Sequence, residues 1–438
     1  MKRLLLAPVL PALFGCGEDF TPQHELESLR VLAVKKDPPY AAPGDIVQLS
    51  MLSADARGED RPVRDHNNAW ARRHIHWFSG CYNPFGGAYA LCYPQLIPAF
   101  TPLLQGVDEP PEIPFRYGRG NHFALQVPAD GVLQPPIDAQ QPRSGTGYVF
   151  FAVCDGTLTL TPAFEALIEG LVDRLVDDCL ADADPTPACA QPILDACPTD
   201  DDCTPQLIAA CAQDPGVQEC ALGSLDDAAA AFEGFPLLCQ DEDGNYLGAD
   251  DYVAGYTQVF IYDEITNQNP AIDGIEFKGQ RIEFDGARDW EDCSCLDDQC
   301  VGDLAADPPI PEFECRQPDP GNSSDSGPDI PSVPACEDDG DASCPEHSFK
   351  PVISRDSAEV DAALGSRIRE QVWVNYYVDR GGLTRPLRLL NDAERGWSDD
   401  YETGFLAPKE PGRVNLWAVV HDNRGGTSWV RQTIEVTE

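Results

Sequence analysis

The sequence predicts a mainly β protein made of two antiparallel β-sandwiches, each interrupted by a cysteine-rich insertion. Three observations support this. Short apolar segments of period two are separated by turns rich in proline and glycine, which is typical of sandwiches. One long segment instead has the helical period of 3.6. The 438 residues include 17 cysteines, and such a number is typical of an oxidising compartment, where disulfides persist.

The first sandwich is expected over residues 28–266. The turn Ala42-Pro43-Gly44-Asp45 separates its first two strands, because proline fixes φ and glycine accepts a positive φ. Trp77 lies in the third strand and is expected to be buried. The proline-rich residues 94–118 are expected to form an extended surface loop. The predicted strands are Leu29–Val34, Ile46–Met51, Ile75–Ser79, His122–Val127, Tyr148–Val153 and Thr257–Tyr262.

Residues 157–238 are expected to form a helical, disulfide-stapled insertion in this sandwich. Thr161 can cap a helix that has Pro162 at its first position. Short helices cannot bury enough apolar surface to be stable alone, and disulfides can compensate. The apolar face consists of Phe164, Leu167, Ile168, Leu171 and Leu175, and the cysteines of the insertion are Cys179, Cys189, Cys197, Cys203, Cys211 and Cys220.

Four further cysteines are candidates for two disulfides in the first sandwich. Cys81 and Cys92 flank a loop rich in glycine and tyrosine, and their separation suits a local bridge. Cys154 and Cys239 bracket the helical insertion and could close its neck.

The second sandwich is expected over residues 267–438, beginning with Ile272–Ile282. Residues 289–345 show little apolar periodicity and hold six cysteines, which predicts an irregular insertion fixed by disulfides. Asp422-Asn423-Arg424-Gly425-Gly426 predicts a hairpin turn. Trp417 and Trp429 flank this turn and are interpreted as packing residues, with a ligand platform as the alternative. The predicted strands of the last ninety residues are Val372–Val378, Val414–Val420 and Thr427–Val436.

The first fifteen residues have the features of a secretory signal peptide. Lys2 and Arg3 precede an apolar run that is too short to span a bilayer. The sequence Leu13-Phe14-Gly15-Cys16 resembles the lipobox of bacterial lipoproteins. The resemblance implies cleavage of residues 1–15, a diacylglycerol on Cys16, and residues 16–27 as a lipidated polar tether. Gly17 in place of the aspartate linked to inner-membrane retention favours the outer membrane. The alternative is an ordinary signal peptide with a cysteine by chance.

Several strands and turns together resemble a known class of surface protein. The segments that carry the resemblance are Leu29–Val34 with the turn at 42–45, Thr257–Tyr262 with Asn269-Pro270, and Trp417–Val420 with the turn at 422–426. They look like parts of bacterial surface lipoproteins with immunoglobulin-like domains. The resemblance implies that both sandwiches are immunoglobulin-like and that the protein lies at the outer membrane, facing the periplasm or the cell surface.

Charge and histidine placement limit the candidate ligands. A formal net charge of -44 repels phosphate backbones, so nucleic acid is excluded as a partner. His74 and His76 lie two residues apart on a predicted strand, so both rings point to one face and could hold zinc with an acidic third ligand. His66 lies nearby in the sequence. The alternative interpretation is that these histidines are solvated at the start of an exposed strand.

An acidic loop offers a second candidate metal site. Asp241, Asp243 and Asn245 alternate beside Gly244, as the oxygen ligands of calcium do in tight loops. Tyr246 stands where an EF-hand needs its glycine, so the match is partial. The alternative is a polar hairpin turn without metal.

No catalytic motif of the hydrolase, metalloprotease or phosphate-loop type is present in the sequence. The leading hypothesis is therefore a non-enzymatic, lipid-anchored protein of the cell envelope. Its role would be structural, or binding and adhesion to an envelope protein or a glycan, with the membrane reached through Cys16 and no cofactor. One alternative is a calcium-dependent adhesion module. A second is a metal-dependent enzyme that uses His74 and His76.

Overall fold

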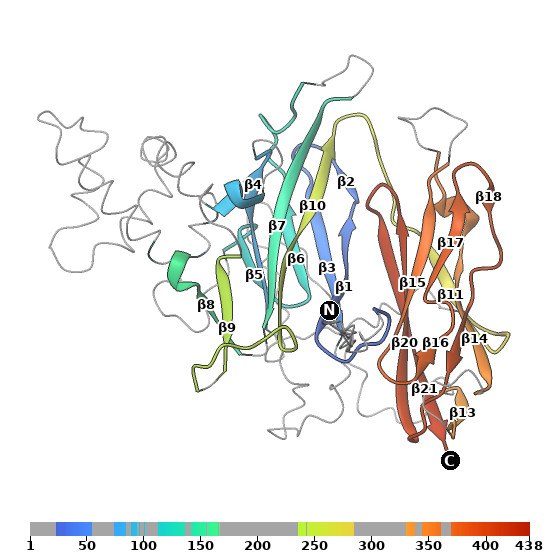
Figure 1. Cartoon of the computed structure of the whole chain (residues 1–438). Helices are drawn as coiled ribbons and strands as arrows, with labels where there is room; N and C mark the ends of the chain where they lie inside the picture. Colours follow the sequence, from blue (N-terminus) through green and yellow to red (C-terminus); the bar gives the residue numbers. More distant parts are fainter. Residues whose placement is uncertain are drawn as a thin grey trace, which may run out of the picture.

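The computed structural model of the chain is mainly β (Figure 1). It describes residues 23–54, 74–84, 89–93, 113–135, 142–154, 156–164, 235–241, 243–283, 330–337, 344–360 and 369–438, together with residues 96, 100 and 166. The strands in these ranges form five sheets. Strands before residue 263 make up three of them, called here the first β unit, and strands after residue 271 make up two, called the second β unit.

The first β unit consists of two facing sheets and a small ribbon. One sheet has the order β1-β3-β6 and the other β2-β10-β7-β4-β5, with β8 and β9 paired separately. All pairs are antiparallel except β2 with β10. The strands are β1 Arg30–Asp37, β2 Tyr40–Ala41, β3 Ile46–Ala54, β4 His74–Tyr82, β5 Tyr117–Arg119, β6 His122–Gln126, β7 Ser144–Cys154, β8 Thr157–Leu160, β9 Leu237–Gln240 and β10 Tyr252–Tyr262.

The core of the first β unit lies between its two large sheets. Trp77 of β4 is fully buried there, as expected, and its indole stacks on Phe123 and meets Phe151 edge to face. Its Nε1–H donates to the Gly120 carbonyl over 2.7 Å, so the polar edge of the ring is satisfied. Alternate residues of β3, such as Val47 and Leu49, fill the same core, which is the period-two pattern of a strand with one buried face.

The second β unit also has two facing sheets. Their orders are β13-β21-β20-β15-β17-β18 and β12-β11-β14-β19-β16. Val374, Tyr376 and Phe405 are among the buried residues between them. The strands are β11 Ile272–Phe277, β12 Gln280–Glu283, β13 Ser332–Pro334, β14 Glu346–Ile353, β15 Val372–Val378, β16 Gly382–Leu383, β17 Leu387–Asp392, β18 Gly396–Trp397, β19 Thr403–Leu406, β20 Gly412–Asp422 and β21 Thr427–Thr437.

The insertion expected over residues 157–238 begins and ends differently from the prediction. Both ends of residues 157–238 are strands, β8 and β9, because Leu158 and Leu160 alternate with threonines and bury their side chains. As predicted, the helical residues begin at Pro162 and Thr161 caps them, because the Phe164 N–H donates to the Thr161 side chain over 3.2 Å. The rest of this insertion and its six cysteines lie outside the described residues.

Two other segments also differ from the prediction. The expected irregular stretch 289–345 contains β13, which pairs in parallel with the final strand, and most of the stretch lies outside the described residues. The expected loop 94–118 contains the start of β5, whose pairing with β4 supplies a backbone ladder that local sequence does not reveal. In both cases a partner distant in sequence decides the structure.

Residues 23–27, expected to belong to a polar tether, are part of the folded body. The Leu26 N–H donates to the Val378 carbonyl and the Val378 N–H donates to the His24 carbonyl, each over 3.0 Å. Leu26 is fully buried between the two β units. We call residues 23–27 the N-terminal strap. In the part of the chain that the structure describes, no helix is long and apolar enough to cross a membrane.

Candidate functional site

The two β units meet through an apolar contact on the outer face of the sheet that contains β20 and β21. Along β20, Leu416 and Ala418 point into the core of the second unit, so Trp417 and Val419 point out of it. Trp429 of β21 lies directly opposite Val419. Residues of the first unit and the strap cover this face, namely Leu26, Leu32, Ala33 and Ala54. The contact is the junction between the units, and the two tryptophans are packing residues in it.

A buried ionic cluster completes the junction beside this contact. It is carried by the turn between β20 and β21, where the Asp422 carboxylate accepts from the backbone N–H groups of Arg424 and Gly426, each over 2.8 Å. Gly425 takes a φ of 90°, which favours glycine. The local turn chemistry therefore fixes the backbone of Arg424 and directs its side chain into the junction.

The Arg424 guanidinium joins three separate parts of the chain. It forms an ion pair with Glu370, just before β15, and donates to the Thr266 carbonyl in the segment that links the two units. It also lies over the Tyr40 ring of the first unit, 5.0 Å from the ring centroid. Because each contact belongs to a different segment, this one side chain fixes both units and their connection.

Two asparagines of the linking segment extend the cluster. Asn267 Nδ2 donates to Asp422 Oδ2 over 3.2 Å. Asn269 Nδ2 donates to the Lys36 carbonyl over 2.7 Å, and Asn269 Oδ1 accepts from the Thr427 N–H over 2.9 Å. The linking segment therefore bonds to β1 on one side and to β21 on the other. It is held between the two units by hydrogen bonds to both.

Burial shifts the titration of two charged groups in the junction. It raises the pKa of Glu370 to about 7, although the neighbouring Arg424 favours the ionised form. It lowers the pKa of Lys36 to about 8, although Asp422 favours the charged form. The junction therefore contains two buried groups, Glu370 and Lys36, whose charge changes close to neutral pH.

His74 and His76, the candidate zinc ligands, lie on β4 with their ring centroids 6.3 Å apart. His76 is not at an exposed strand end, because β4 is flanked by β5 and β7 and the residue is only 4% exposed. Its Nδ1 lies 2.9 Å from the Tyr117 hydroxyl, and burial lowers its pKa to about 3, so the ring is neutral. Within the described residues no group of three metal-binding side chains occurs, and His66 lies outside them.

The candidate calcium ligands lie in the turn after β9. Asp241 Oδ1 accepts from the backbone N–H groups of Asp243 and Asn245, over 2.9 and 2.8 Å, and the Asn245 amide also donates to this carboxylate. These bonds lower the pKa of Asp241. The carboxylate thus satisfies the amides of its own loop, which is the arrangement of a polar turn.

The candidate disulfide cysteines are paired as the sequence suggested. Cys81 and Cys92 are joined, with Cα atoms 5.3 Å apart, and Cys154 and Cys239 are joined, with Cα atoms 5.7 Å apart. Cys154 ends β7 and Cys239 lies in β9, so the second bridge ties the β8–β9 ribbon to the large sheet. A further bridge joins Cys336 and Cys344 in the second unit. Cys16, the candidate lipidation site, lies outside the described residues.

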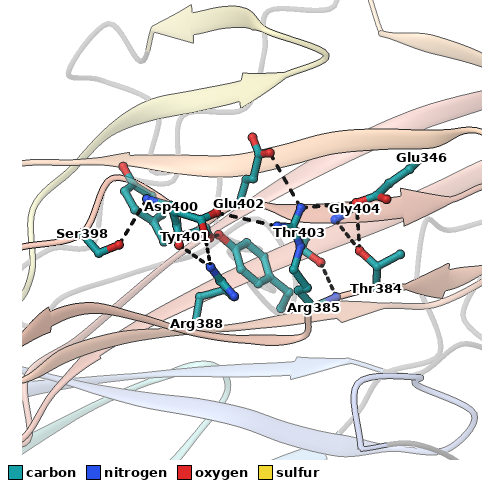
Figure 2. A network of polar contacts seen from close by, with 11 residues as sticks. Glu346, Thr384, Arg385, Arg388, Ser398, Asp400, Tyr401, Glu402, Thr403 and Gly404 are labelled. Atoms are coloured by element: carbon teal, nitrogen blue, oxygen red, sulfur yellow. Dashed lines mark hydrogen bonds and ion pairs between the residues drawn. The ribbon is translucent and has the colours of Figure 1, made fainter.

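A second arginine network lies on the surface of the second unit (Figure 2). Arg385 pairs with Glu346 over 3.3 Å and lies 3.7 Å from both Asp400 and Glu402. Arg388 pairs with Asp400 over 2.9 Å. The network joins the start of β14 to the segments around β17 and β19, and its side chains reach solvent.

Sequence reasoning missed Arg424 and Glu370 as junction residues. An arginine in a glycine-rich hairpin turn is ordinarily a solvated residue, and a glutamate before a strand gives no signal of burial. The available signal was the turn itself, whose aspartate and two glycines hold its backbone in one conformation.

Neither a protein-family model nor a curated protein sequence matches this chain.

Proposed function

We propose that this protein is a non-enzymatic, lipid-anchored component of the cell envelope with a structural or binding role. The supporting observation is the N-terminal strap: its residues begin seven positions after Cys16, and its Leu26 is buried in the junction. Seven residues span at most about 25 Å. A lipid on Cys16 would therefore hold the N-terminal strap close to the membrane.

The disulfides support the expected compartment. Three bridges, Cys81–Cys92, Cys154–Cys239 and Cys336–Cys344, suit an oxidising environment outside the cytoplasm. The junction supports a structural role, because the two units share an apolar contact, the stacking of Arg424 on Tyr40, and a linking segment bonded to both.

We further propose that both units are immunoglobulin-like sandwiches. In the first unit the order β1-β3-β6 facing β5-β4-β7-β10 matches strands A, B and E facing C′, C, F and G of that fold. Trp77 then occupies the position of the buried tryptophan on strand C. Phe151 and Phe123 pack around it in place of the inter-sheet disulfide of antibody domains.

Membrane fractionation of a Cys16→Ser variant tests the anchor. The wild-type protein is expected to sediment with outer membranes and to incorporate labelled fatty acid, whereas the variant appears in the soluble fraction. Gly17→Asp is the matched control, since it keeps the lipid and should move the protein to the inner membrane. A Cys16→Ser variant that still sediments with membranes would refute the anchor.

A further inference from the structure

A cavity of about 300 Å³ opens at one end of the second β unit. It lies where the β17–β18 turn meets the single-turn helix η4, Arg355–Ser357. It adjoins the buried ionic cluster, because the Asn391 amide donates to the Glu370 carbonyl, and its lining combines an indole with two guanidinium groups. The residues that matter here are Arg355, Asp356, Ala358, Arg369, Asn391 and Trp397.

The floor of the cavity is held in place by the core beneath it. Trp397 packs against the core of the second unit and meets the Tyr401 ring edge to face, with centroids 6.4 Å apart. Ala358 and Asn391 are almost fully buried, and the Asn391 amide donates to the Glu370 carbonyl. The floor is therefore preformed and largely apolar, as small-molecule sites are.

The rim of the cavity carries two guanidinium groups, those of Arg355 and Arg369. Arg369 donates one Nη1–H to the Ala358 carbonyl over 2.5 Å. Among the described residues, this carbonyl is the hydrogen-bond acceptor of the guanidinium. A guanidinium carries five N–H donors, so most of its donors can still take a ligand. Arg355 Nη2 already holds both oxygens of Asp399, each over 2.8 Å. The Asp356 carboxylate beside it disfavours ligands of high negative charge.

We propose that this cavity binds a small organic monocarboxylate with an apolar ring or chain. The apolar part would lie on the Trp397 indole, and the carboxylate would take a two-pronged bond from Arg369, the geometry that arginine provides for this group. A volume of about 300 Å³ is at the lower end of ligand sites, which limits the ligand to a single ring or a short chain.

The position of the cavity in the fold suits a receptor role. Asn391 of the cavity pairs with Val372 at the start of β15, whereas the N-terminal strap bonds to Val378 at the end of the same strand. The two sites are six residues apart along an extended strand, or about 20 Å. If the proposed lipid anchor holds the strap at the membrane, the cavity faces away from it; this orientation alone rests on the proposed function.

Calorimetric titration of the full chain with N-acetylphenylalanine tests the proposal, with N-acetylphenylalanine amide as the matched neutral probe. We expect saturable binding of the acid and at least tenfold weaker binding of the amide. Arg369→Gln should weaken binding of the acid at least tenfold and leave binding of the amide unchanged. Trp397→Leu should weaken binding of both. Arg395→Gln is the matched control, because Arg395 is exposed on the neighbouring turn and does not line the cavity.

Three results would overturn the carboxylate site: equal binding of acid and amide, wild-type affinity in Arg369→Gln, or no binding of the acid at millimolar concentration. Circular dichroism of each variant establishes that it is folded. The titration does not depend on the lipid, so its failure would leave the fractionation of the Cys16→Ser variant unaffected, and the reverse also holds.

Discussion

Two arginine networks of the second β unit differ in one respect, their access to water. At the junction, the side chains of Arg424 and Glu370 are 7% and 0% exposed. On the surface, the side chains of Arg385 and Glu346 are 36% and 49% exposed, and Asp400 more so (Figure 2). Both arginines face several acidic residues, Glu359 lying 3.9 Å from Arg424. The number of charged partners is therefore similar.

Solvent access makes these two networks energetically different. Exposed ion pairs contribute roughly 0 to 1 kcal/mol each, because water and salt screen them. A buried pair has already lost its hydration, so removing one partner leaves an uncompensated charge in a low-dielectric environment. We infer that the stability of the junction depends on Arg424, and that the surface network contributes mainly to local order. The three predictions below test this difference.

The largest effect is expected for Arg424→Met. At pH 8 the carboxylate of Glu370 would remain buried without its cation, and the Thr266 carbonyl would lose its donor. The free energy of unfolding should fall by about 3–5 kcal/mol, measured by urea denaturation. At pH 5 the loss should be smaller, because protonated Glu370 no longer needs a counter-charge. An equal loss at both pH values would contradict the assigned role of Glu370.

An effect on the order of 3 kcal/mol is expected from the titration of Glu370. Its pKa is raised to about 7 in the folded protein, so the native state binds more protons than the unfolded chain between about pH 4.5 and pH 7. The contribution of Glu370 to stability is therefore fully present below pH 4.5, falls as the pH rises to 7, and is constant above it.

Glu370→Gln isolates this contribution, because glutamine resembles the protonated acid and does not titrate. The variant should lack this decrease between pH 4.5 and 7. Thermal unfolding across this range at constant ionic strength provides the measurement. A wild-type pH profile in the variant would assign the titration to another group.

The smallest effect is expected for Arg385→Gln in the surface network. Its partners Glu346, Asp400 and Glu402 stay hydrated when the guanidinium is removed. The free energy of unfolding should fall by less than about 1 kcal/mol, and the difference should shrink further at 1 M salt. A loss as large as that of Arg424→Met would show that burial does not distinguish the two networks.

The strands of the second unit show how far sequence reasoning extends. The sequence predicts a strand over Val372–Val378, the bounds that β15 has, because alternating apolar residues in a long strand reveal its buried face. β16 and β18 have only two residues each, too few to show a period, and they exist because they pair with β19 and β17. Such short strands depend on partners distant in sequence.

Residue patterns alone were enough to predict the β class, most long strands, their inward faces, and which cysteines lie close enough to pair locally. The junction, in contrast, depends on packing between distant segments. Alternation along β20 and β21 placed Trp417 and Trp429 outside their own core, but nothing local indicated that Leu26 and β1 would cover them. Likewise, the hydrogen bonds of the turn hold the backbone of Arg424 in one conformation, whereas packing between distant segments buries its ion pair with Glu370. The reason is physical: periodicity records which face of a strand avoids water, whereas the identity of the covering partner depends on contacts between distant segments.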